Sequence, residues 1–278
     1  MTTKKKSFPL SRVILYLVHI IACLLMIFPF IWMLSTALKE TTEVFSFPPQ
    51  LIPEVFMFSN FVVVWELLPF GLAFLNSLKI AVIVVSLQLF TGAMAAYAFA
   101  KLNFKGRDVI FIIVLSTIMI PEQVIVIPLF LMFNELNWID THTAVIMPFA
   151  FVYPFGIFLL RQFMMGIPQE LNEAAVMDGC NPPRIFFRIV VPLCKSAIFA
   201  LMIFSFIASW NSFLYPLIFL HTMDNFTLQL MLAMFQGHYF TDWTLLMAAA
   251  ATAIVPMLVV YLIAQRQIIE GIAITGLK

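Results

Sequence analysis

Six long apolar runs, each bounded by charged or turn-forming residues, constrain this chain more than any other feature of its sequence. A helix of about 20 apolar residues is long enough to cross the hydrocarbon core of a bilayer. The composition agrees, because 63% of the 278 residues are hydrophobic and only 10% are charged, whereas soluble domains carry about 25% charged residues. We therefore predict an all-α, polytopic membrane protein with six transmembrane helices near 13–34, 73–98, 109–131, 143–163, 195–220 and 246–265.

These runs form one membrane domain between two short tails. We expect a tail at 1–12, a transmembrane domain at 13–265 that contains a polar loop at 164–194, and a second tail at 266–278. The first run exceeds the roughly 7–15 apolar residues of a signal-peptide core, so we expect it to remain as the first helix. Several prolines lie within the later runs and are expected to break or kink their helices: Pro121, Pro128, Pro148, Pro154 and Pro256.

The placement of lysine and arginine predicts the orientation of the chain. Positive residues that flank short loops are retained on the cytoplasmic side of a membrane. All fifteen except Lys39 and Lys79 fall on one side of the six-span arrangement. We therefore expect both termini and the 164–194 loop to be cytoplasmic. The formal net charge of +1 gives no reason to expect a nucleic-acid partner.

The 164–194 loop reads as a helix, a turn and a second helix. Pro168 suits the first turn of a helix, where its missing N–H costs nothing. Gly179 suits the left-handed residue that ends a helix, and Pro182-Pro183 prevents the helix from continuing. A second amphipathic stretch follows at 184–191.

The first of these two helices has a narrow face with small residues at its centre. Leu171, Ala174, Ala175 and Asp178 recur at three- and four-residue spacing, and Glu173 stands beside them. Small side chains allow another protein to approach the backbone closely, and the carboxylate offers a partner for a basic group. The alternative is a surface helix that rests among the lipid headgroups, and the residues alone leave both open.

This loop resembles a motif of known transporters. Glu173-Ala174-Ala175, Gly179 and Ile189 to Pro192 match the EAA loop of binding-protein-dependent ABC importers, Glu-Ala-Ala-x3-Gly-x9-Ile-x-Leu-Pro, except that Val191 stands where the family has Leu. Further runs resemble the second membrane subunit of the maltose-type sugar permeases. These are Ala96 to Lys101, Met119 to Pro121, Leu136 to Thr141 and Trp210 to Leu217.

The resemblance implies a type I ABC importer permease in a bacterial cell membrane. Such a subunit moves an oligosaccharide or related sugar into the cytoplasm and is not itself an enzyme. ATP and Mg²⁺ would be bound by two partner ATPase subunits, and the remaining partners would be a second permease subunit, an extracytoplasmic sugar-binding protein and membrane lipid. The residues expected to couple the chain to the ATPase are Glu173, Ala174, Ala175, Asp178, Gly179, Ile189 and Pro192.

Polar residues within the runs are candidates for the translocation pathway, because such groups are costly in lipid and usually face protein or water. The alternative for each is hydrogen bonding between helices, which is the commoner role. The candidates are Asn76, Gln88, Glu122, Gln123, Trp210, Asn211 and Tyr215. Gly92, Ala96 and Ala100 recur every fourth residue and are expected to serve helix packing.

Two extracytoplasmic segments, 35–72 and 221–245, are long enough to receive a binding protein. The second is favoured, since the resemblance implies that the corresponding loop enters the sugar cleft of that protein. Its candidate contacts are Asp224, Asn225, Gln236, Gly237, His238 and Tyr239.

Other function classes lack the residues they would need. The chain has no Gly-x4-Gly-Lys-Ser/Thr motif for nucleotide phosphates, and its cysteines and histidines form no metal-ligand pattern. A membrane enzyme would require clustered nucleophiles, acids or ligands, which are not evident. A secondary transporter or channel for a small polar solute stays as the alternative, although no inverted repeat is visible.

Overall fold

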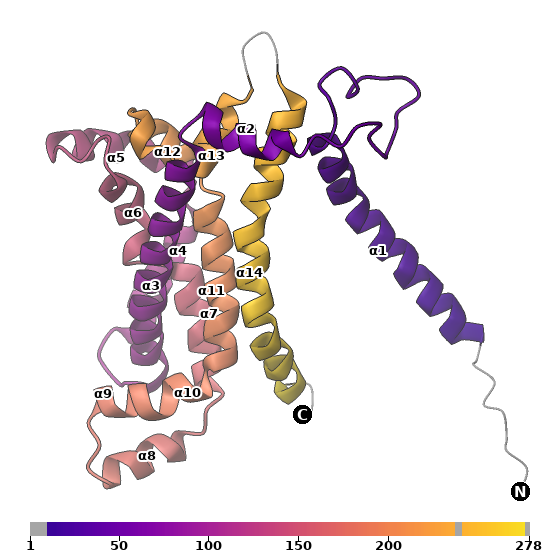
Figure 1. Cartoon of the computed structure of the whole chain (residues 1–278). Coiled ribbons are helices and arrows are strands. Elements are labelled where there is room, and N and C mark those ends of the chain that lie inside the picture. Colours follow the sequence, from indigo (N-terminus) through magenta and orange to yellow (C-terminus); the bar gives the residue numbers. More distant parts are fainter. Residues whose placement is uncertain (1–9, 237–240, 276–278) are drawn as a thin grey trace, which may run out of the picture. The chain divides into compact units, whose positions relative to one another are not determined.

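The computed structural model describes residues 10–236 and 241–275, and the regular secondary structure of these residues is helical apart from one antiparallel bridge between Gln236 and Thr241 (Figure 1). They fall into two compact units, one comprising 1–68 and 234–252, the other 69–233 and 253–278. The first unit holds α1 (Leu10–Ala37), α2 (Ser59–Leu67) and the start of α14 (Trp243–Thr275). The second holds α3 (Phe70–Lys101), α4 (Arg107–Ser116), η1 (Thr117–Met119), α5 (Glu122–Glu135), α6 (His142–Ala150), α7 (Pro154–Met165), α8 (Gln169–Met177), α9 (Pro182–Ile185), the π-helical turn η2 (Phe186–Val190), α10 (Val191–Leu193), α11 (Lys195–Trp210), α12 (Leu214–Phe219), η3 (Met223–Asn225) and most of α13 (Leu228–Met234).

Five helical segments are long and apolar enough to cross a membrane, and each overlaps a predicted run. They are Arg12–Ala37, Phe70–Lys101, His142–Met165, Lys195–Phe219 and Trp243–Arg266. A sixth crossing is present if the bent pair described next is one span. The all-α, polytopic fold is therefore confirmed.

The third predicted run, 109–131, is broken at Pro121, one of the prolines expected to break or kink a helix. Arg107–Met119 and Glu122–Glu135 meet at an angle of 97°. Ile120 is extended, with ψ 116°, because the ring of Pro121 disfavours helical geometry in the residue before it. Pro121 thus ends one helix and lies at the start of another, whereas Pro128, Pro148 and Pro256 lie inside helices that continue.

The first unit is organised around a buried lysine. Lys39 is 2% exposed, and its ammonium group donates a hydrogen bond to the Gln50 carbonyl oxygen at 2.5 Å. The same group lies 5.2 Å from the ring centroid of Trp32. Asn60, in α2, donates to the carbonyl oxygens of Ala37 and Lys39, both at 2.9 Å. These bonds fix the segment that follows α1, which the sequence shows only as a long loop.

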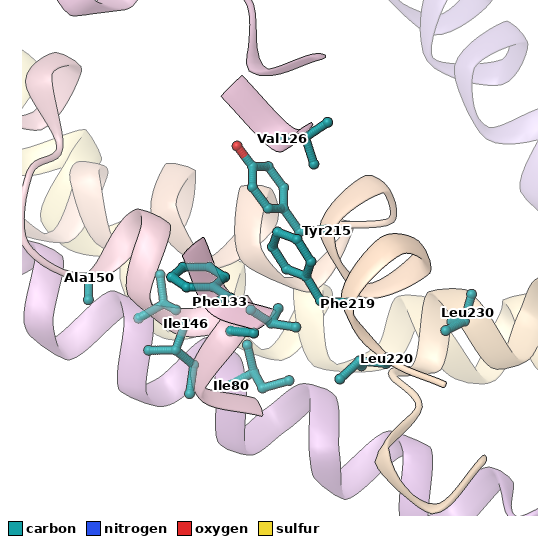
Figure 2. Close-up of a cluster of buried hydrophobic side chains, with 12 residues drawn as sticks. Ile80, Val126, Phe133, Ile146, Ala150, Tyr215, Phe219, Leu220 and Leu230 are labelled. Atoms are coloured by element: carbon teal, nitrogen blue, oxygen red, sulfur yellow. The ribbon is translucent and has the colours of Figure 1, made fainter. Parts of the chain in front are cut away.

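In the second unit, α3 packs along α7 and α11, and α8 and α9 lie together at one end of these helices (Figure 1). Towards the other end, a buried cluster joins α3 to α5, α6 and α12 (Figure 2). Tyr215 contacts Phe149 and Phe219 there, with ring centroids 4.7 Å and 5.6 Å apart. The two ends of the unit are thus held by different elements, the α8–α9 hairpin at one and α5 with α12 at the other.

Candidate functional site: a polar cavity and an anchored helical hairpin

The segment 164–194 folds as the helix, turn and helix that its sequence predicts. Helix α8 begins after Pro168, which is its N-cap residue, and ends at Met177, with Asp178 as its C-cap residue. Gly179 has a φ of 77°, the left-handed conformation that glycine adopts without steric cost. Asn181 caps α9, since its side-chain oxygen accepts a hydrogen bond from the Arg184 backbone N–H at 3.1 Å.

The hairpin is anchored to the membrane helices by an apolar cluster. Ala175, Ile185, Phe186 and Val190 are buried in it together with side chains of α3 and α7. Ile189 is partly buried against the same cluster, while Pro192 is exposed. The Lys101 ammonium group, at the end of α3, donates to the Ile167 carbonyl oxygen at 2.6 Å, just before α8. The hairpin is therefore tied to the end of α3 as well as packed against the membrane helices.

The predicted contact face of α8 requires a correction. Ala175 is only 6% exposed, because it packs into the chain's own core. Glu173, Ala174 and Asp178 are exposed, and Met177 is 87% exposed. The two alanines of the motif therefore have different surroundings: Ala174 is available to a partner and Ala175 holds the helix in place.

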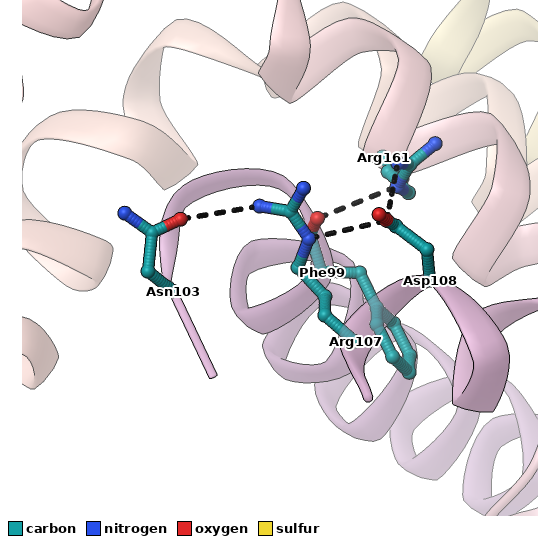
Figure 3. A network of polar contacts seen from close by, with 5 residues as sticks. All are labelled: Phe99, Asn103, Arg107, Asp108 and Arg161. Carbon is teal, nitrogen blue, oxygen red and sulfur yellow. Dashed lines mark hydrogen bonds and ion pairs between the residues drawn. The ribbon is translucent and has the colours of Figure 1, made fainter. Parts of the chain in front are cut away.

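A network of polar contacts closes the turn between α3 and α4 (Figure 3). The Arg161 guanidinium donates to the Phe99 carbonyl oxygen at 3.4 Å and pairs with the Asp108 carboxylate at 3.8 Å. It also lies 4.2 Å from the ring centroid of Phe111. Arg107 reaches Asp108 at 3.2 Å. The network ties the start of α4 to α3 and α7 near the end that carries the hairpin.

A cavity of about 320 Å³ lies between the helices of the second unit. It is lined by neutral polar groups, aromatic rings and one carboxylate: Gln88, Glu122, Phe149, Tyr153, Ser205, Ser209, Asn211, Ser212, Phe213 and Tyr215, with Ile80, Val84, Val145, Ala208 and Leu214 completing the wall. Four predicted pathway residues are among them, namely Gln88, Glu122, Asn211 and Tyr215.

Two of these four side chains are engaged in hydrogen bonds within the protein, and only those of Gln88 run to other residues of the cavity wall. The Gln88 amide donates to the Phe149 carbonyl oxygen at 3.0 Å and accepts from the Ser205 hydroxyl, so that it joins α3, α6 and α11. The Asn211 amide donates to the Ile207 carbonyl oxygen at 3.0 Å and accepts from Gln229 at 3.1 Å. The bonds of Gln88 and the bond from Gln229 join different helices, which is the alternative role for such residues, whereas the bond to Ile207 stays within α11.

The other three predicted pathway residues lie outside the cavity wall. Trp210 is 1% exposed, and its indole N–H donates to the Ala253 carbonyl oxygen at 3.0 Å. Asn76 donates to the carbonyl oxygens of Asp224 and Phe226 at 2.8 Å and 3.0 Å, so it holds the loop after α12. Gln123 is exposed on α5.

The loop after α12 is also held by Asp140, a residue whose part here the sequence did not reveal. The Asp140 carboxylate accepts hydrogen bonds from the backbone N–H groups of His221 and Thr222 at 2.9 Å and 3.0 Å, and from the Thr222 hydroxyl. Burial acts to raise the pKa of the Asp140 carboxyl, but these bonds outweigh burial and hold that pKa below its ordinary value. The carboxylate is therefore ionised at neutral pH and fixes the loop.

The predicted binding-protein contacts lie on this loop or beyond it. Asp224 is exposed, whereas Asn225 donates to the Asp140 carbonyl oxygen at 2.7 Å. Gln236 is exposed, and Gly237, His238 and Tyr239 lie outside the described residues. The serines of the cavity were also missed, although Ser205, Ser209 and Ser212 recur at helical spacing and so mark one face of an apolar run.

A bundle of membrane-crossing helices around a polar cavity, with a helical hairpin fixed to one end, defines a membrane permease. Residues 88–273 match the family described as binding-protein-dependent transport system inner membrane component, and the chain belongs to this family. It is 35% identical to the arabinooligosaccharides transport system permease protein AraQ of Bacillus subtilis, over 98% of both chains. It is 31% identical to the lactose transport system permease protein LacG of Rhizobium radiobacter, over 98% of this chain and 97% of that one.

Solved structures support the fold. A bacterial ABC transporter involved in the import of the acidic polysaccharide alginate has a chain that superposes with a TM-score of 0.81, over 96% of this chain and 99% of that chain, at 23% identity. A structure of a bacterial alginate ABC transporter in complex with an alginate pentasaccharide-bound periplasmic protein superposes with a TM-score of 0.66 at 18% identity, over 91% of this chain and 93% of that chain.

Proposed function

We propose that this chain is a permease subunit of an ATP-driven importer, and that it moves an oligosaccharide or related sugar into the cytoplasm. The observation that carries the proposal is the cavity in the second unit, which combines amides and hydroxyls with aromatic rings. Hydroxyl and amide groups bind sugar hydroxyls, whereas the faces of Phe and Tyr rings cover the apolar C–H side of a pyranose. The relatives whose names specify arabinooligosaccharides and lactose support a carbohydrate cargo.

The energy for transport would come from partner subunits that bind ATP and Mg²⁺. The exposed side of α8 offers Glu173 and Ala174 to a cleft on an ATPase, with Asp178 and Gly179 at the end of the helix. The buried side of α8, at Ala175, and the bond from Lys101 would pass the movement of the ATPase to the membrane helices. A second permease subunit would supply the other half of the pathway.

The same proposal includes the orientation of the chain in the membrane, with both termini and residues 164–194 in the cytoplasm. Single cysteines at Met177 and Asp224, both exposed positions, test it in a background without Cys23, Cys180 and Cys194. We expect a membrane-impermeant maleimide to label intact cells at position 224 and to label position 177 only after the membrane is opened. Labelling of position 177 from outside, with position 224 protected, would reverse the assigned orientation.

The loop fixed by Asp140 is our candidate for contact with the sugar-binding protein. Asp224 and Asn225 are the described residues of this surface; Asn76 bonds the Asp224 carbonyl oxygen, and the Asn225 side chain bonds the Asp140 carbonyl oxygen. A preformed loop loses little conformational entropy when it binds. Photocrosslinkers at Asp224 and Met177 test both partner assignments in one experiment.

We expect the crosslinker at 224 to capture a sugar-binding protein and the one at 177 to capture an ATPase, during uptake of a panel of radiolabelled oligosaccharides. Loss of the chain should abolish uptake of the cargo. If uptake proceeds without the ATPase and neither position captures these partners, the chain is a secondary transporter or a channel, and the proposal is wrong.

A further inference from the structure

Glu122 is the acidic residue among the described residues that line the cavity, and its position follows from the break in the third membrane segment. It is the first residue of α5, directly after Pro121, where the chain turns by 97°. This turn places the Glu122 side chain among the cavity-lining residues of α3, α6 and α11. An unbroken helix would instead carry it along the axis of α4.

No basic side chain of the described residues lines the cavity with Glu122. The other polar groups of the wall are amides and hydroxyls, and Gln88 and Asn211 are engaged in hydrogen bonds with their neighbours. Glu122 is exposed, so its carboxylate can reach a bound molecule. Among the described residues, the cavity wall therefore holds one acidic charge and no cation that compensates it.

A carboxylate in such a cavity has two effects on a carbohydrate. It is a strong acceptor for the hydroxyl groups of a sugar, and bonds to a charged acceptor are stronger than neutral ones. Walls of low dielectric constant also focus its field, so the cavity attracts cations and repels anions. A uronic acid, a sulfate ester or a sugar phosphate would meet this repulsion, whereas an uncharged sugar would not.

We propose that Glu122 is a specificity-determining residue that restricts the cargo to carbohydrates without acidic groups. The inference rests on the proposed function, because it assigns the charge class of the molecule that the permease carries. The cargo is then a neutral oligosaccharide. Some of its hydroxyl groups donate hydrogen bonds to the Glu122 carboxylate, and the others contact Ser209, Ser212 and Tyr215.

The field of the carboxylate can be measured without knowing the cargo. A Ser209→Cys reporter in the assembled complex, again without the native cysteines, is treated with a cationic and an anionic methanethiosulfonate reagent of similar size. We expect the ratio of the cationic to the anionic modification rate to fall by about tenfold or more when Glu122→Gln is added. Asp224→Asn, which removes an exposed carboxylate outside the cavity, is the matched control and should leave the ratio unchanged.

The charge of the cargo is tested by uptake. Cells that express the complete wild-type complex are offered neutral trisaccharides and, separately, trigalacturonate, and Glu122→Lys is compared with Glu122→Gln. We expect the wild type to take up the neutral trisaccharides but not trigalacturonate. We expect Glu122→Lys to take up the neutral trisaccharides at least tenfold more slowly than Glu122→Gln. An unchanged modification ratio, or uptake of trigalacturonate comparable with that of a neutral sugar, would overturn the inference and leave the permease function standing. The proposed function itself fails on a different result, uptake that does not require the chain or the ATPase.

Discussion

Ala174→Trp is expected to abolish sugar uptake while the amount of protein in the membrane stays unchanged. Ala174 is exposed on α8, between Glu173 and the buried Ala175. An indole ring at this position would hold the ATPase away from the helix backbone, whereas the fold has room for it. Uptake of the radiolabelled cargo and the binding-protein-stimulated ATPase activity of the purified complex measure the effect. Both should fall to background.

The neighbouring position provides the contrast that identifies a docking defect. Ala175→Trp should also abolish uptake, but through loss of folded protein, because Ala175 is 6% exposed in the cluster with Ile185 and Phe186. Overfilling a packed core costs about 1–3 kcal/mol or more. Ala174→Ser should transport normally, since it changes size little. If Ala174→Trp assembles with the ATPase and transports like the wild type, α8 is a surface helix without a coupling role.

The carboxylate beside this position makes the same test more specific. Glu173→Ala shortens the side chain beside Ala174 and removes its charge without adding bulk to the contact face. If a buried basic group of the ATPase pairs with Glu173, removing the Glu173 carboxylate weakens the binding of the ATPase by about 2–5 kcal/mol. We therefore expect weaker assembly of the ATPase with Glu173→Ala, measured by co-purification, and normal assembly with Ala174→Ser.

The membrane runs could be predicted because length and hydropathy are local properties of the sequence. The break at Pro121 could also be anticipated, since proline restricts the residue before it. The angle of 97° could not, because it depends on how α5 packs against α6 and α12 in the cluster around Phe133 and Phe219. Local chemistry thus gives the position of a break, and tertiary packing gives its direction.

The site was less accessible to sequence reasoning for a related reason. Gln88 and Ser205 lie far apart in the chain, and their hydrogen bond depends on the register of α3 against α11. Tertiary packing likewise places Ala175, but not Ala174, in a buried cluster. A motif identifies which residues matter together, whereas only the packed structure shows which of them face a partner.

Small residues in α3 illustrate the same limit. Gly92 belongs to a spacing that predicts close packing of helices, yet a methyl group added there would meet nothing within 4 Å. At Gly156, in α7, the added carbon would lie 2.5 Å from the Tyr153 ring and 3.0 Å from a methyl group of Leu201. The close approach between α7 and α11 therefore occurs at a glycine that the four-residue spacing does not include.

Gly156→Ala is consequently expected to destabilise the protein, whereas Gly92→Ala is expected to be neutral or slightly stabilising. Both glycines are buried in membrane helices, so the same methyl group is added to two comparable backbones. At Gly156 the Tyr153 ring must move or α7 must separate from α11, at a cost of about 1–3 kcal/mol. At Gly92 the greater helix propensity of alanine is gained without a clash.

Thermal unfolding of the purified variants in detergent should show a lower melting temperature for Gly156→Ala alone. Because Tyr153 also lines the cavity, the Ser209→Cys reporter should react at an altered rate in the Gly156→Ala variant. Equal melting temperatures for the two variants would show that α7 and α11 do not pack closely at Gly156.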